Sequence, residues 1–580
     1  MCKYIVVVGG VISGVGKGVA TASIARMMQE RGFEVSVIKI DPYINCDAGT
    51  LRPTEHGEVW VTDDGGEIDQ DLGNYERFLG KSLSKHNNIT TGQIYKSLIE
   101  KERRGDFLGE TVSFIPHVPN EIKNRIKKVS EGKDIVLIEI GGTVGDYENV
   151  PFLFAMKSLE NELGSDNIAY ILVTYLPIPS HIEEMKSKPT QIAVKLLREN
   201  GIQPDFILCR GKKRLDEIRK KKLELYANIK SENIISMPDV IGPGTVNTIY
   251  VIPLDLEKEG LGDKILKKLN LVEKKHPDWS LWEEAVEKIL VPEKVIRVAM
   301  VGKYLDIGDY QLTDSYISVN EAIKHAAANN NCKVEIEWID SKEFERDPFG
   351  VEKLKHFNGL IVPGGFGGSG VEGKINAIKY SRENNIPYLG LCFGLQLAVI
   401  EFARNVCNLR DAHTTEINSL TSNPVIDILP EQKNINEKGG TMRLGAYRAL
   451  LGEGSRVAGL YGFNEDYESG QQVHKPLEVY ESGQQVHKPL EVYESGQQVH
   501  KPLEVYERHR HRYEVNPDYH QILTNNGLVF SGVSPNGRLV EFIELPNHKF
   551  FVATQAHPEF KSSLLKPAPL FDGFVKACLE

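Results

Sequence analysis

The sequence predicts an α/β protein built from two doubly wound domains. Residues 4–8 form an apolar run that leads into a glycine-rich loop and then into a helical run at 19–29. The same order of strand, tight glycine turn and helix recurs at residues 386–403. A continuous apolar strand before such a turn is typical of a parallel sheet covered by helices. The chain of 580 residues is long enough for about two to four domains.

The composition is that of an ordinary globular protein, with 41% hydrophobic and 26% charged residues. A net charge of −11 argues against a general nucleic-acid binder. Seven scattered cysteines without a Cys-x-x-Cys pair exclude a disulfide framework or a zinc module, and they suit a reducing compartment. The apolar runs at 4–8 and 386–400 are too short for a signal peptide and a membrane span, respectively. We therefore expect a cytoplasmic protein with no membrane segment.

The glycine-rich loop at residues 9–18 predicts a phosphate site. A loop with a lysine, Lys17, between a strand and a helix cradles phosphates with backbone N–H groups and the helix N-terminus. The loop departs from the usual GxxxxGK[ST] pattern, because its first glycine is one residue early and Gly18 replaces the hydroxyl residue that binds magnesium. If the loop holds ATP, carboxylates elsewhere must hold the metal.

Two acidic segments are candidates for that metal site. The apolar run 134–139 ends in Glu139, and the segment 62–73 carries several acids among glycines, including Asp71. Magnesium prefers one or two carboxylates together with phosphate oxygens, so Asp71 and Glu139 would suffice. The alternative is a solvated acidic surface loop. The missing hydroxyl at Gly18 favours the metal interpretation.

A second phosphate site is predicted at residues 186–191, Lys-Ser-Lys-Pro-Thr-Gln, which open a helical run at 192–199. Two lysines, two hydroxyls and a helix N-terminus attract phosphate groups. As an isolated motif this is weak, and the basic residues at 212–222 that follow suit a solvated helix face.

A nucleophile is predicted at Cys392, inside the run Gly390-Leu-Cys-Phe-Gly394. A nucleophile on a sharp strand-to-helix turn needs small flanking residues, and the helix behind it favours the thiolate. Residues 555–560, Gln-Ala-His-Pro-Glu-Phe, supply a base, His557, and a carboxylate, Glu559. Backbone N–H groups of Gly365 and Phe393 are candidates for binding an oxyanion. The alternative is an inert buried thiol, but the three elements together predict acyl transfer through a thioester.

This constellation resembles the glutamine amidotransferase domain of the triad type, which releases ammonia from the glutamine side chain. Ammonia in neutral water is mostly ammonium, so such a domain is expected to serve a second site that consumes ammonia. The resemblance implies a set of residues that hold the glutamine: Gly365, Phe393, Gly394, Leu395, Gln396, Glu416 and Arg512.

The chain as a whole resembles the CTP synthase family, nearly end to end. The resemblance is carried, in order, by residues 9–18, 41–43, 56–59, 69–78, 139–146, 186–191, 440–445 and 508–514. It implies an ATP-dependent amide ligase with a P-loop-type, dethiobiotin-synthetase-like domain. ATP phosphorylates O4 of UTP, and ammonia from glutamine then displaces the phosphate to give CTP.

The same resemblance implies the nucleotide contacts. Magnesium would be held by Asp71 and Glu139, and a nucleotide-gated ammonia passage would lie near His56 and Val59. The residues expected to bind ATP are Gly14, Val15, Gly16, Lys17, Gly18, Val19, Asp71, Pro238, Asp239 and Val240. The residues expected to bind UTP, or CTP as feedback inhibitor, are Ser13, Asp146, Tyr147, Glu148, Lys186, Ser187, Lys188, Pro189, Thr190, Gln191 and Lys222.

Regulation and assembly are also implied by the family. They comprise GTP as an allosteric activator, inhibition by CTP, a homotetramer, and filaments as a further assembly. Gly14, where bacterial members usually carry a second serine, and the stretch 174–181 depart from the pattern and indicate a divergent, archaeal-like branch.

The domain organisation follows from these motifs. We expect an amidoligase domain at 1–271, a polar linker at 272–294 and a glutamine amidotransferase domain at 295–580. Residues 468–506 are three identical copies of a 13-residue unit, which is too short for a solenoid repeat. We expect a polar surface loop, with the repeated Leu-Glu-Val-Tyr as a hairpin strand and with no metal on the repeated histidines.

Two alternatives to CTP synthesis stay open at this point. One is another glutamine-dependent P-loop ligase, such as a cobyrinic acid amidase, which would lack the paired-lysine site at 186–191. The other is a P-loop switch or filament scaffold with an inactive glutaminase. The complete set of Cys392, His557 and Glu559 argues against the second.

Overall fold

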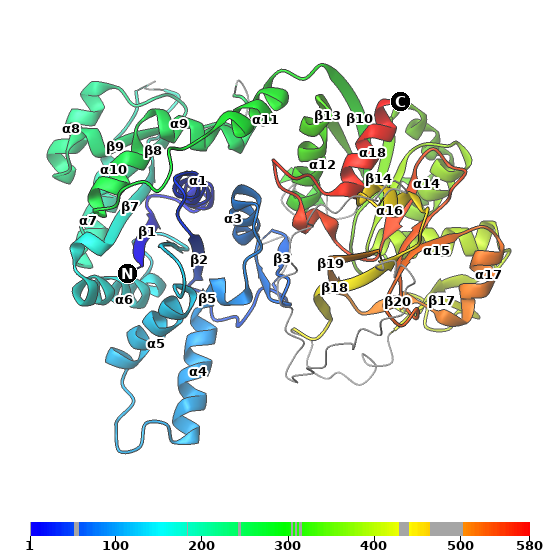
Figure 1. The fold of residues 1–580 in the computed structure, drawn as a ribbon, viewed down its shortest axis with the longest axis horizontal. Helices are drawn as coiled ribbons and strands as arrows, with labels where there is room; N and C mark the ends of the chain where they lie inside the picture. Colours follow the sequence, from blue (N-terminus) through cyan, green and yellow to red (C-terminus); the bar gives the residue numbers. More distant parts are fainter. Residues whose placement is uncertain are drawn as a thin grey trace, which may run out of the picture. The chain divides into compact units, whose positions relative to one another are not determined.

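The computed structural model describes residues 2–51, 57–181, 184–241, 245–302, 306–307, 310–311, 316–428, 440–463 and 503–580. The chain divides into two compact units (Figure 1), which are described separately. Unit 1 comprises Met1–Thr50 and Ile68–Val291, and unit 2 comprises Leu51–Glu67 and Pro292–Glu580. Among the described residues, no helix has the length and apolarity that crossing a membrane requires.

Unit 1 is built on a seven-stranded parallel sheet, as the apolar run at its start predicts. The strand order is β5-β2-β6-β1-β7-β8-β9. The strands are β1 (Lys3–Gly9), β2 (Val35–Asp41), β5 (Asn88–Thr90), β6 (Ile135–Ile140), β7 (Ile168–Tyr175), β8 (Phe206–Gly211) and β9 (Ile234–Pro238). β1 lies in the middle, between β6 and β7, so its carboxyl end is the place where such sheets bind ligands.

Helices cover both faces of this sheet. α5 and α6 share one hydrophobic core with the strands, whereas α1 packs with α3 and α9. The helices are α1 (Lys17–Glu30), α3 (Asp71–Leu79), α4 (Thr91–Arg104), α5 (Phe114–Val129), α6 (Val150–Leu163), α7 (Lys188–Glu199), α8 (Glu217–Ala227), α9 (Ile252–Lys258) and α10 (Leu261–Lys268). The predicted doubly wound architecture is confirmed.

Unit 2 contains a nine-stranded mixed sheet of order β13-β10-β14-β15-β23-β22-β21-β18-β19. The first five strands are parallel: β13 (Cys332–Asp340), β10 (Lys294–Gly302), β14 (Gly359–Val362), β15 (Tyr388–Leu391) and β23 (Phe551–Thr554). An antiparallel extension follows, formed by β22 (Val540–Glu544), β21 (Val529–Val533), β18 (Arg443–Leu451) and β19 (Glu504–His511).

The helices of unit 2 also lie on both faces of its sheet. α14 (Val371–Glu383) and α15 (Phe393–Asn405) belong to one hydrophobic core, and α12 (Ile317–Asn329) and α18 (Pro569–Leu579) belong to the other. Shorter helices are α13 (Ser341–Arg346), α16 (Arg456–Leu460) and α17 (His520–Asn525). A small sheet joins β16 (Ala412–Thr414), β17 (Asn423–Ile428) and β20 (Tyr513–Val515), and β3 (Val59–Val61) and β4 (Glu67–Asp69) form a hairpin.

The predicted linker contains a helix, α11 (Ser280–Leu290). Its Trp282 is buried, and the indole N–H donates to the carbonyl of Tyr250 over 2.8 Å. The ring of Trp282 also lies 5.6 Å from that of Phe78. The linker sequence is polar overall, but α11 has one apolar face, which packs within unit 1.

The third copy of the 13-residue unit ends in a strand. Its last residues, 503–506, lead into β19, where Tyr506 pairs with Arg448 of β18. The prediction that Leu-Glu-Val-Tyr forms a hairpin strand therefore fits this copy. The first two copies, and the predicted loop that contains them, lie outside the described residues.

Candidate functional site

The turn that carries Cys392 is strained, as its sequence predicts. Cys392 has φ 50° and ψ −99°, a conformation that costs a non-glycine residue about 1–3 kcal/mol. Its N–H donates to the carbonyl of Thr554 on β23 over 2.7 Å, which anchors the turn. A Cβ on Gly394 would lie 2.2 Å from the Val362 carbonyl oxygen, so only glycine fits there. Cys392 stands at the N-terminus of α15, immediately after β15.

His557 and Glu559 lie beside this cysteine. Nδ1 of His557 is 2.6 Å from Oε1 of Glu559. A Cβ on Gly364 would lie 2.9 Å from Cε1 of His557 and 3.7 Å from Cβ of Cys392, so the imidazole and the thiol share one narrow space. All three predicted triad residues are buried, which keeps water from competing with the hydrogen bond between imidazole and carboxylate.

The charge state of His557 is set by these neighbours. Burial opposes protonation, but Glu559 and the hydrogen-bonded Cys392 outweigh it and raise the pKa of His557 to about 10. An imidazolium between a carboxylate and a thiolate is the resting state of an activated cysteine nucleophile. The arrangement can therefore perform acyl transfer.

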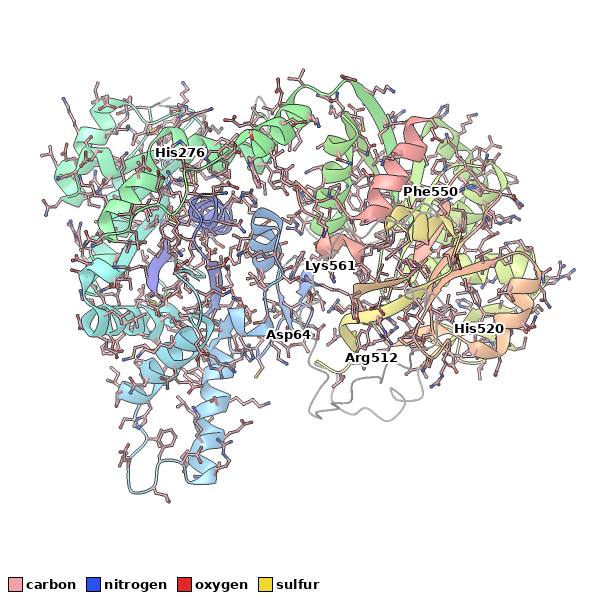
Figure 2. The ribbon with its side chains drawn as sticks, viewed as in Figure 1. Asp64, His276, Arg512, His520, Phe550 and Lys561 are labelled. Carbon is pink, nitrogen blue, oxygen red and sulfur yellow. The ribbon has the colours of Figure 1, made fainter. Side chains whose placement is uncertain are left out.

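The residues expected to hold glutamine surround the same turn. The amide of Gln396, in the first turn of α15, donates to the Tyr513 carbonyl over 2.9 Å, next to Arg512. Arg512, which is labelled in Figure 2, donates to the carbonyl and hydroxyl oxygens of Thr441, over 3.2 and 2.9 Å. Glu416 accepts the N–H of Gly367 over 2.9 Å, which ties it to the loop that contains Gly365. The turn, the loop and β20 thus bring the predicted residues into one region, but their ligand roles stay predictions.

A buried ionic cluster beside the triad was missed by sequence reasoning. Arg443 of β18 pairs with Glu541 over 2.6 Å and with Glu514 over 2.9 Å. Burial, together with the Arg443 charge, holds the pKa of His509 and of His511 well below the usual range. The alternating Arg-His run 508–512 gave the only signal, because in a strand such alternation places the two histidines on one face.

Lys17 lies where the phosphate loop predicts. It is buried at the start of α1, and its ammonium group donates to the Gly142 carbonyl over 2.7 Å. The N–H of Val144 donates to the Gly9 carbonyl over 2.9 Å, so the loop at 141–146 adjoins the phosphate loop. Burial lowers the pKa of Lys17, which phosphate oxygens at this position would counter.

The missing hydroxyl at Gly18 has a structural counterpart. A Cβ on Gly18 would lie 2.5 Å from Oδ1 of Asp71, at the start of α3. The carboxylate thus occupies the space that a serine or threonine side chain would need. Lys39 of β2 contacts Asp71, and it lies 3.0 Å from Oε1 of Glu139. One buried ammonium therefore brings the two predicted metal ligands together.

Lys39 was not singled out from the sequence. A charged residue inside a buried strand is unusual, and this was the available signal. Burial opposes ionisation of Asp71, but Lys39 outweighs it and lowers the pKa of that carboxyl. Burial and the charges of Asp71 and Asp41 raise the pKa of Asp69 to about 8. Among the described residues, no group of three or more His, Cys, Asp or Glu is arranged to hold a metal ion. Asp71 and Glu139 provide two carboxylates, which suits magnesium only when phosphate and water complete its ligands.

The second predicted phosphate site also meets the phosphate loop. A Cβ on Gly10 would lie 2.4 Å from Cβ of Ala193, so α7 touches this loop. Lys186 pairs with Glu184 over 2.6 Å at the start of the 186–191 segment. The hydrogen bond from Lys186 lowers the pKa of Glu184, and Lys222 of α8 contributes to the same shift. Arg219 of α8 also pairs with Glu184, over 3.3 Å, so the helix that carries Lys222 adjoins this segment. The roles of Lys186 and Lys222 in binding UTP stay predictions.

The remaining predicted nucleotide residues lie around the same loop. Asp146 accepts the N–H of Thr143 over 2.6 Å, and Tyr147 beside it is exposed. Asp239 accepts Nε of Arg210 over 2.6 Å, and Nη1 of Arg210 donates to the Gly14 carbonyl over 3.1 Å. Arg210, which sequence reasoning missed, thus links residues 238–240 to the phosphate loop. His56, predicted to border an ammonia passage, lies outside the described residues.

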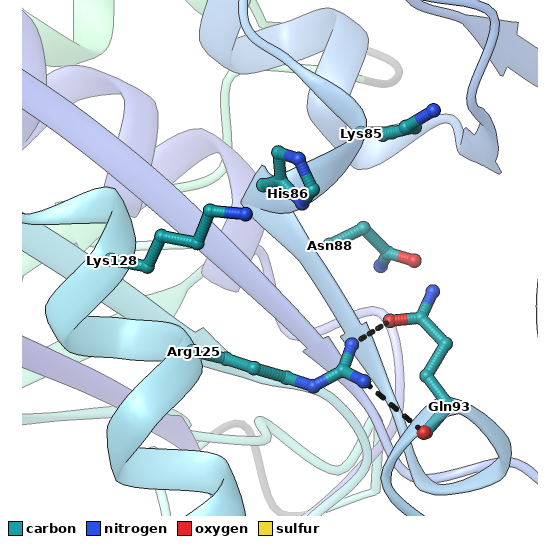
Figure 3. Close-up of a pocket in the computed structure, with 6 residues that line it drawn as sticks. All are labelled: Lys85, His86, Asn88, Gln93, Arg125 and Lys128. Atoms are coloured by element: carbon teal, nitrogen blue, oxygen red, sulfur yellow. Dashed lines mark hydrogen bonds between the residues drawn. The ribbon is translucent and has the colours of Figure 1, made fainter. Parts of the chain in front are cut away.

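A small basic cavity in unit 1 is separate from all predicted residues (Figure 3). It has a volume of about 40 Å³ and is lined by Lys85, His86, Asn88, Gln93, Arg125 and Lys128. The guanidinium of Arg125 already donates to the side-chain and main-chain oxygens of Gln93, over 3.0 and 3.2 Å. Ligand pockets usually reach about 300 Å³ or more, so this cavity is too small for a nucleotide.

The fold and the site together define a glutamine amidotransferase joined to a P-loop-type nucleotide-binding unit. The family model for the CTP synthase N-terminus matches residues 3–271, and that for the class-I glutamine amidotransferase matches residues 311–577. A CTP synthase of Methanocaldococcus jannaschii is 50% identical, covering 100% of this chain and 98% of its own length. A CTP synthase of Methanococcus maripaludis is 49% identical over 100% of both chains. The chain belongs to the CTP synthase family.

A solved structure, the Trypanosoma brucei CTPS glutaminase domain with bound acivicin, is 34% identical to this chain. The match covers 49% of this chain and 94% of that domain, with a TM-score of 0.39.

Proposed function

We propose that this chain converts UTP to CTP, using ATP and ammonia released from glutamine. The observation that carries the proposal is a combination within one chain. CTP synthases match it from end to end, unit 2 holds an assembled Cys392–His557–Glu559 triad, and unit 1 holds a phosphate loop with a carboxylate in place of the missing hydroxyl. No observation favours the cobyrinic acid amidase alternative.

The glutaminase half-reaction uses the triad. The Cys392 thiolate attacks the glutamine side-chain carbonyl, and the His557 imidazolium gives its proton to the departing nitrogen, which leaves as ammonia. Water then attacks the thioester, with His557 as base, and releases glutamate. Glu559 holds the imidazole through Nδ1, 2.6 Å away. Backbone N–H groups of Gly365 and Phe393 stabilise the oxyanion, because Phe393 begins α15 and has no acceptor within its own helix.

The glutamine itself is held by its α-amino and α-carboxyl groups. Glu416 suits the ammonium end, and Arg512 suits the carboxylate through two parallel N–H donors. The remaining contacts come from the turn: Gly365, Phe393, Gly394, Leu395 and Gln396.

The ligase half-reaction takes place in unit 1. The γ-phosphoryl group of ATP moves to O4 of UTP, ammonia adds at C4, and phosphate leaves. Lys17 and the N-terminus of α1 hold the phosphates of ATP, together with residues 13–19 and 238–240. Asp71 and Glu139 would hold Mg²⁺, whose charge would offset that of the transferred phosphoryl group. UTP is held by Ser13, residues 146–148 and 186–191, and Lys222.

Regulation, assembly and location belong to the same proposal and rest on the family resemblance. GTP activates glutamine hydrolysis, CTP inhibits from the UTP site, and the chain forms homotetramers that can extend into filaments. The ammonia passage that the resemblance implies near His56 and Val59 is part of the same proposal. We also propose domains at 1–271 and 295–580, and a cytoplasmic location because all seven cysteines are free thiols.

A product assay tests the proposal. The purified chain is incubated with ATP, Mg²⁺, UTP and glutamine, and the nucleotides are separated and quantified. We expect CTP, ADP, phosphate and glutamate in equal amounts, with CTP also formed when ammonium chloride replaces glutamine. A folded, ATP-binding preparation that makes no CTP from either nitrogen source would contradict the proposal.

A further inference from the structure

A short N-terminal segment is part of unit 2. Residues Leu51–Glu67 group with the glutaminase fold, although they precede it by more than two hundred residues in sequence. We call the described part from Val59 to Glu67 the 59–67 hairpin. Just before it, Glu58 accepts the N–H of Ser318, at the start of α12, over 2.9 Å. The hairpin thus has its own anchors within unit 2.

Two acids of the hairpin pair with arginines of β19. Oδ1 of Asp63 lies 2.6 Å from Nε of the fully buried Arg508 and 3.7 Å from the ammonium of Lys561 (Figure 2 labels Lys561). Oε1 of Glu67, also buried, lies 2.8 Å from Nε of Arg510. Buried, hydrogen-bonded ion pairs fix geometry, because removing one partner leaves the other charge without compensation.

The backbone of the hairpin is fixed to β18 as well. The N–H of Ala446 donates to the Asp63 carbonyl over 2.9 Å. A Cβ on Gly445 would lie 2.6 Å from that carbonyl oxygen, and Gly445 has φ 100°, so a glycine is required for this approach. The hairpin therefore contacts β19 through side chains and β18 through its main chain.

The contacts lead directly to the catalytic histidine. The ring centroid of Trp60 lies 4.9 Å from that of Phe560. The ring of Phe560 stacks on the imidazole of His557 at 5.2 Å, with the planes 20° apart. The N–H of His557 donates to the carbonyl of Arg508 over 2.7 Å. Arg508 therefore pairs with Asp63 through its side chain, and its main-chain carbonyl accepts the N–H of His557.

We infer that the 59–67 hairpin positions the glutaminase site: Trp60 and Asp63 fix His557, and Glu67 fixes the strand that ends beside Arg512. The inference rests on the proposed function only for the identity of the acyl substrate. Asp71, the proposed metal ligand, follows Glu67 by four residues in the chain. The hairpin is therefore one of the covalent connections between the two units.

Four variants test the positioning role. Asp63→Asn and Glu67→Gln remove each charge, Trp60→Leu removes the ring, and Trp60→Phe keeps a ring. Glu337→Gln, which breaks an exposed ion pair with Arg297 on β13 and β10, is the matched control. Glutamine hydrolysis, measured as ammonia release, gives kcat and KM, and mass spectrometry follows alkylation of Cys392 by iodoacetamide across pH.

The expected results differ between variants. Trp60→Leu and Asp63→Asn lower kcat for glutamine by about 10- to 100-fold and move the pH profile of Cys392 alkylation, because the imidazole is displaced. Glu67→Gln mainly raises KM for glutamine, because Arg512 binds substrate. Trp60→Phe restores most of kcat, Glu337→Gln has no effect, and CTP synthesis from ammonium stays within about twofold of wild type.

Two outcomes would overturn the inference. One is kcat and KM within about twofold of wild type in Trp60→Leu and Asp63→Asn. The other is a lowered thermal midpoint with an unchanged alkylation profile, which indicates a structural role alone. Because ammonia release and alkylation need neither UTP nor ATP, they test the hairpin even when wild-type protein makes no CTP, the result that would instead contradict the proposed function.

Discussion

Cys392 shows how a single residue is forced into a reactive conformation. A φ of 50° is unfavourable for a residue other than glycine. The backbone is held in this conformation by β15 before it, by α15 after it and by the hydrogen bond from the Cys392 N–H to the Thr554 carbonyl. Strain at such a position is retained because the thiol then faces His557 at the end of a helix.

Replacement of the nucleophile should separate the two half-reactions. Cys392→Ala should reduce glutamine-dependent CTP synthesis by about 10⁴-fold or more, because no thioester forms. Synthesis from ammonium salts should remain near wild type. Cys407→Ala, a half-buried thiol outside the triad, is the control. Loss of both activities in a folded Cys392→Ala protein would contradict two separate sites.

The charge on His557 gives a pH prediction. Its pKa is raised to about 10, so protonation of the imidazole stabilises the native state. That contribution is complete below about pH 6.5, the ordinary pKa of histidine, and is lost as the pH rises through about 10. Glu559→Gln removes the neighbouring carboxylate and should move the alkaline limb of Cys392 alkylation down by about 1–3 pH units. An unmoved limb would show that Glu559 does not hold the imidazolium.

At the scale of elements, the phosphate loop and its surroundings show which site residues can be predicted from the sequence. The motif at 9–18 and the acids at Asp71 and Glu139 could be picked out from the sequence, because residue type and the succession of strand, loop and helix along the chain single them out. Lys39 and Arg210 were not picked out, because they lie on β2 and β8, whose positions are set only by the strand order of the folded sheet. A sheet order of β5-β2-β6-β1-β7-β8-β9 places residues distant in sequence at one edge, and periodicity alone does not give that order.

The same limit applies in unit 2. The turn at Cys392 and the pair His557–Glu559 follow from local motifs. The Arg443 cluster and the 59–67 hairpin depend on contacts between strands that pair only in the folded chain. Arg508 and Arg510 stand in the same run as Arg512, the predicted glutamine ligand, but their side chains pair with Asp63 and Glu67.

Substitutions in the phosphate loop should have effects opposite to those of Cys392→Ala. Lys17→Ala and Asp71→Asn should lower CTP synthesis from either nitrogen source by about 100-fold or more while glutamine hydrolysis persists. Lys195→Ala, on the exposed face of α7, is the control for charge. Asp71→Asn should also raise the magnesium concentration needed for half-maximal rate. An unchanged magnesium requirement would refute the assignment of Asp71 as a metal ligand.

At the scale of the whole molecule, the repeated insertion joins β18 and α16 to β19. Its third copy supplies the residues at 503–506 that lead into β19, and the carbonyl of Tyr506 accepts the ammonium group of Lys561 over 2.6 Å. Because the copies are identical, the first copy carries the same Leu-Glu-Val-Tyr sequence at 477–480. A shortened chain can therefore rebuild β19 without changing any residue in it.

Deletion of residues 481–506 should leave folding and ammonia-dependent synthesis near wild type. The joined chain reads Leu477-Glu-Val-Tyr480 followed by Glu507, so the strand sequence is preserved. The free energy of closing a loop changes by only about 0.6 kcal/mol for each doubling of the loop's length. A small change in KM for glutamine is expected, since the deletion ends shortly before Arg512, the proposed ligand of the glutamine carboxylate. A collapse of kcat for both glutamine and ammonia in the folded deletion variant would contradict a passive insertion.

The close approach of Gly18 and Asp71 has an evolutionary consequence. A Cβ at position 18 and the carboxylate at position 71 compete for one volume, so neither position can change freely while the other stays as it is. Across homologous sequences the two should therefore vary as a correlated pair, with a hydroxyl residue at 18 accompanied by a smaller, uncharged residue at 71 or by an acid at another position. A return to the common phosphate-loop sequence, with serine or threonine at position 18, would therefore require a second replacement at position 71. Gly18 thus indicates that the carboxylate of Asp71 lies beside the loop.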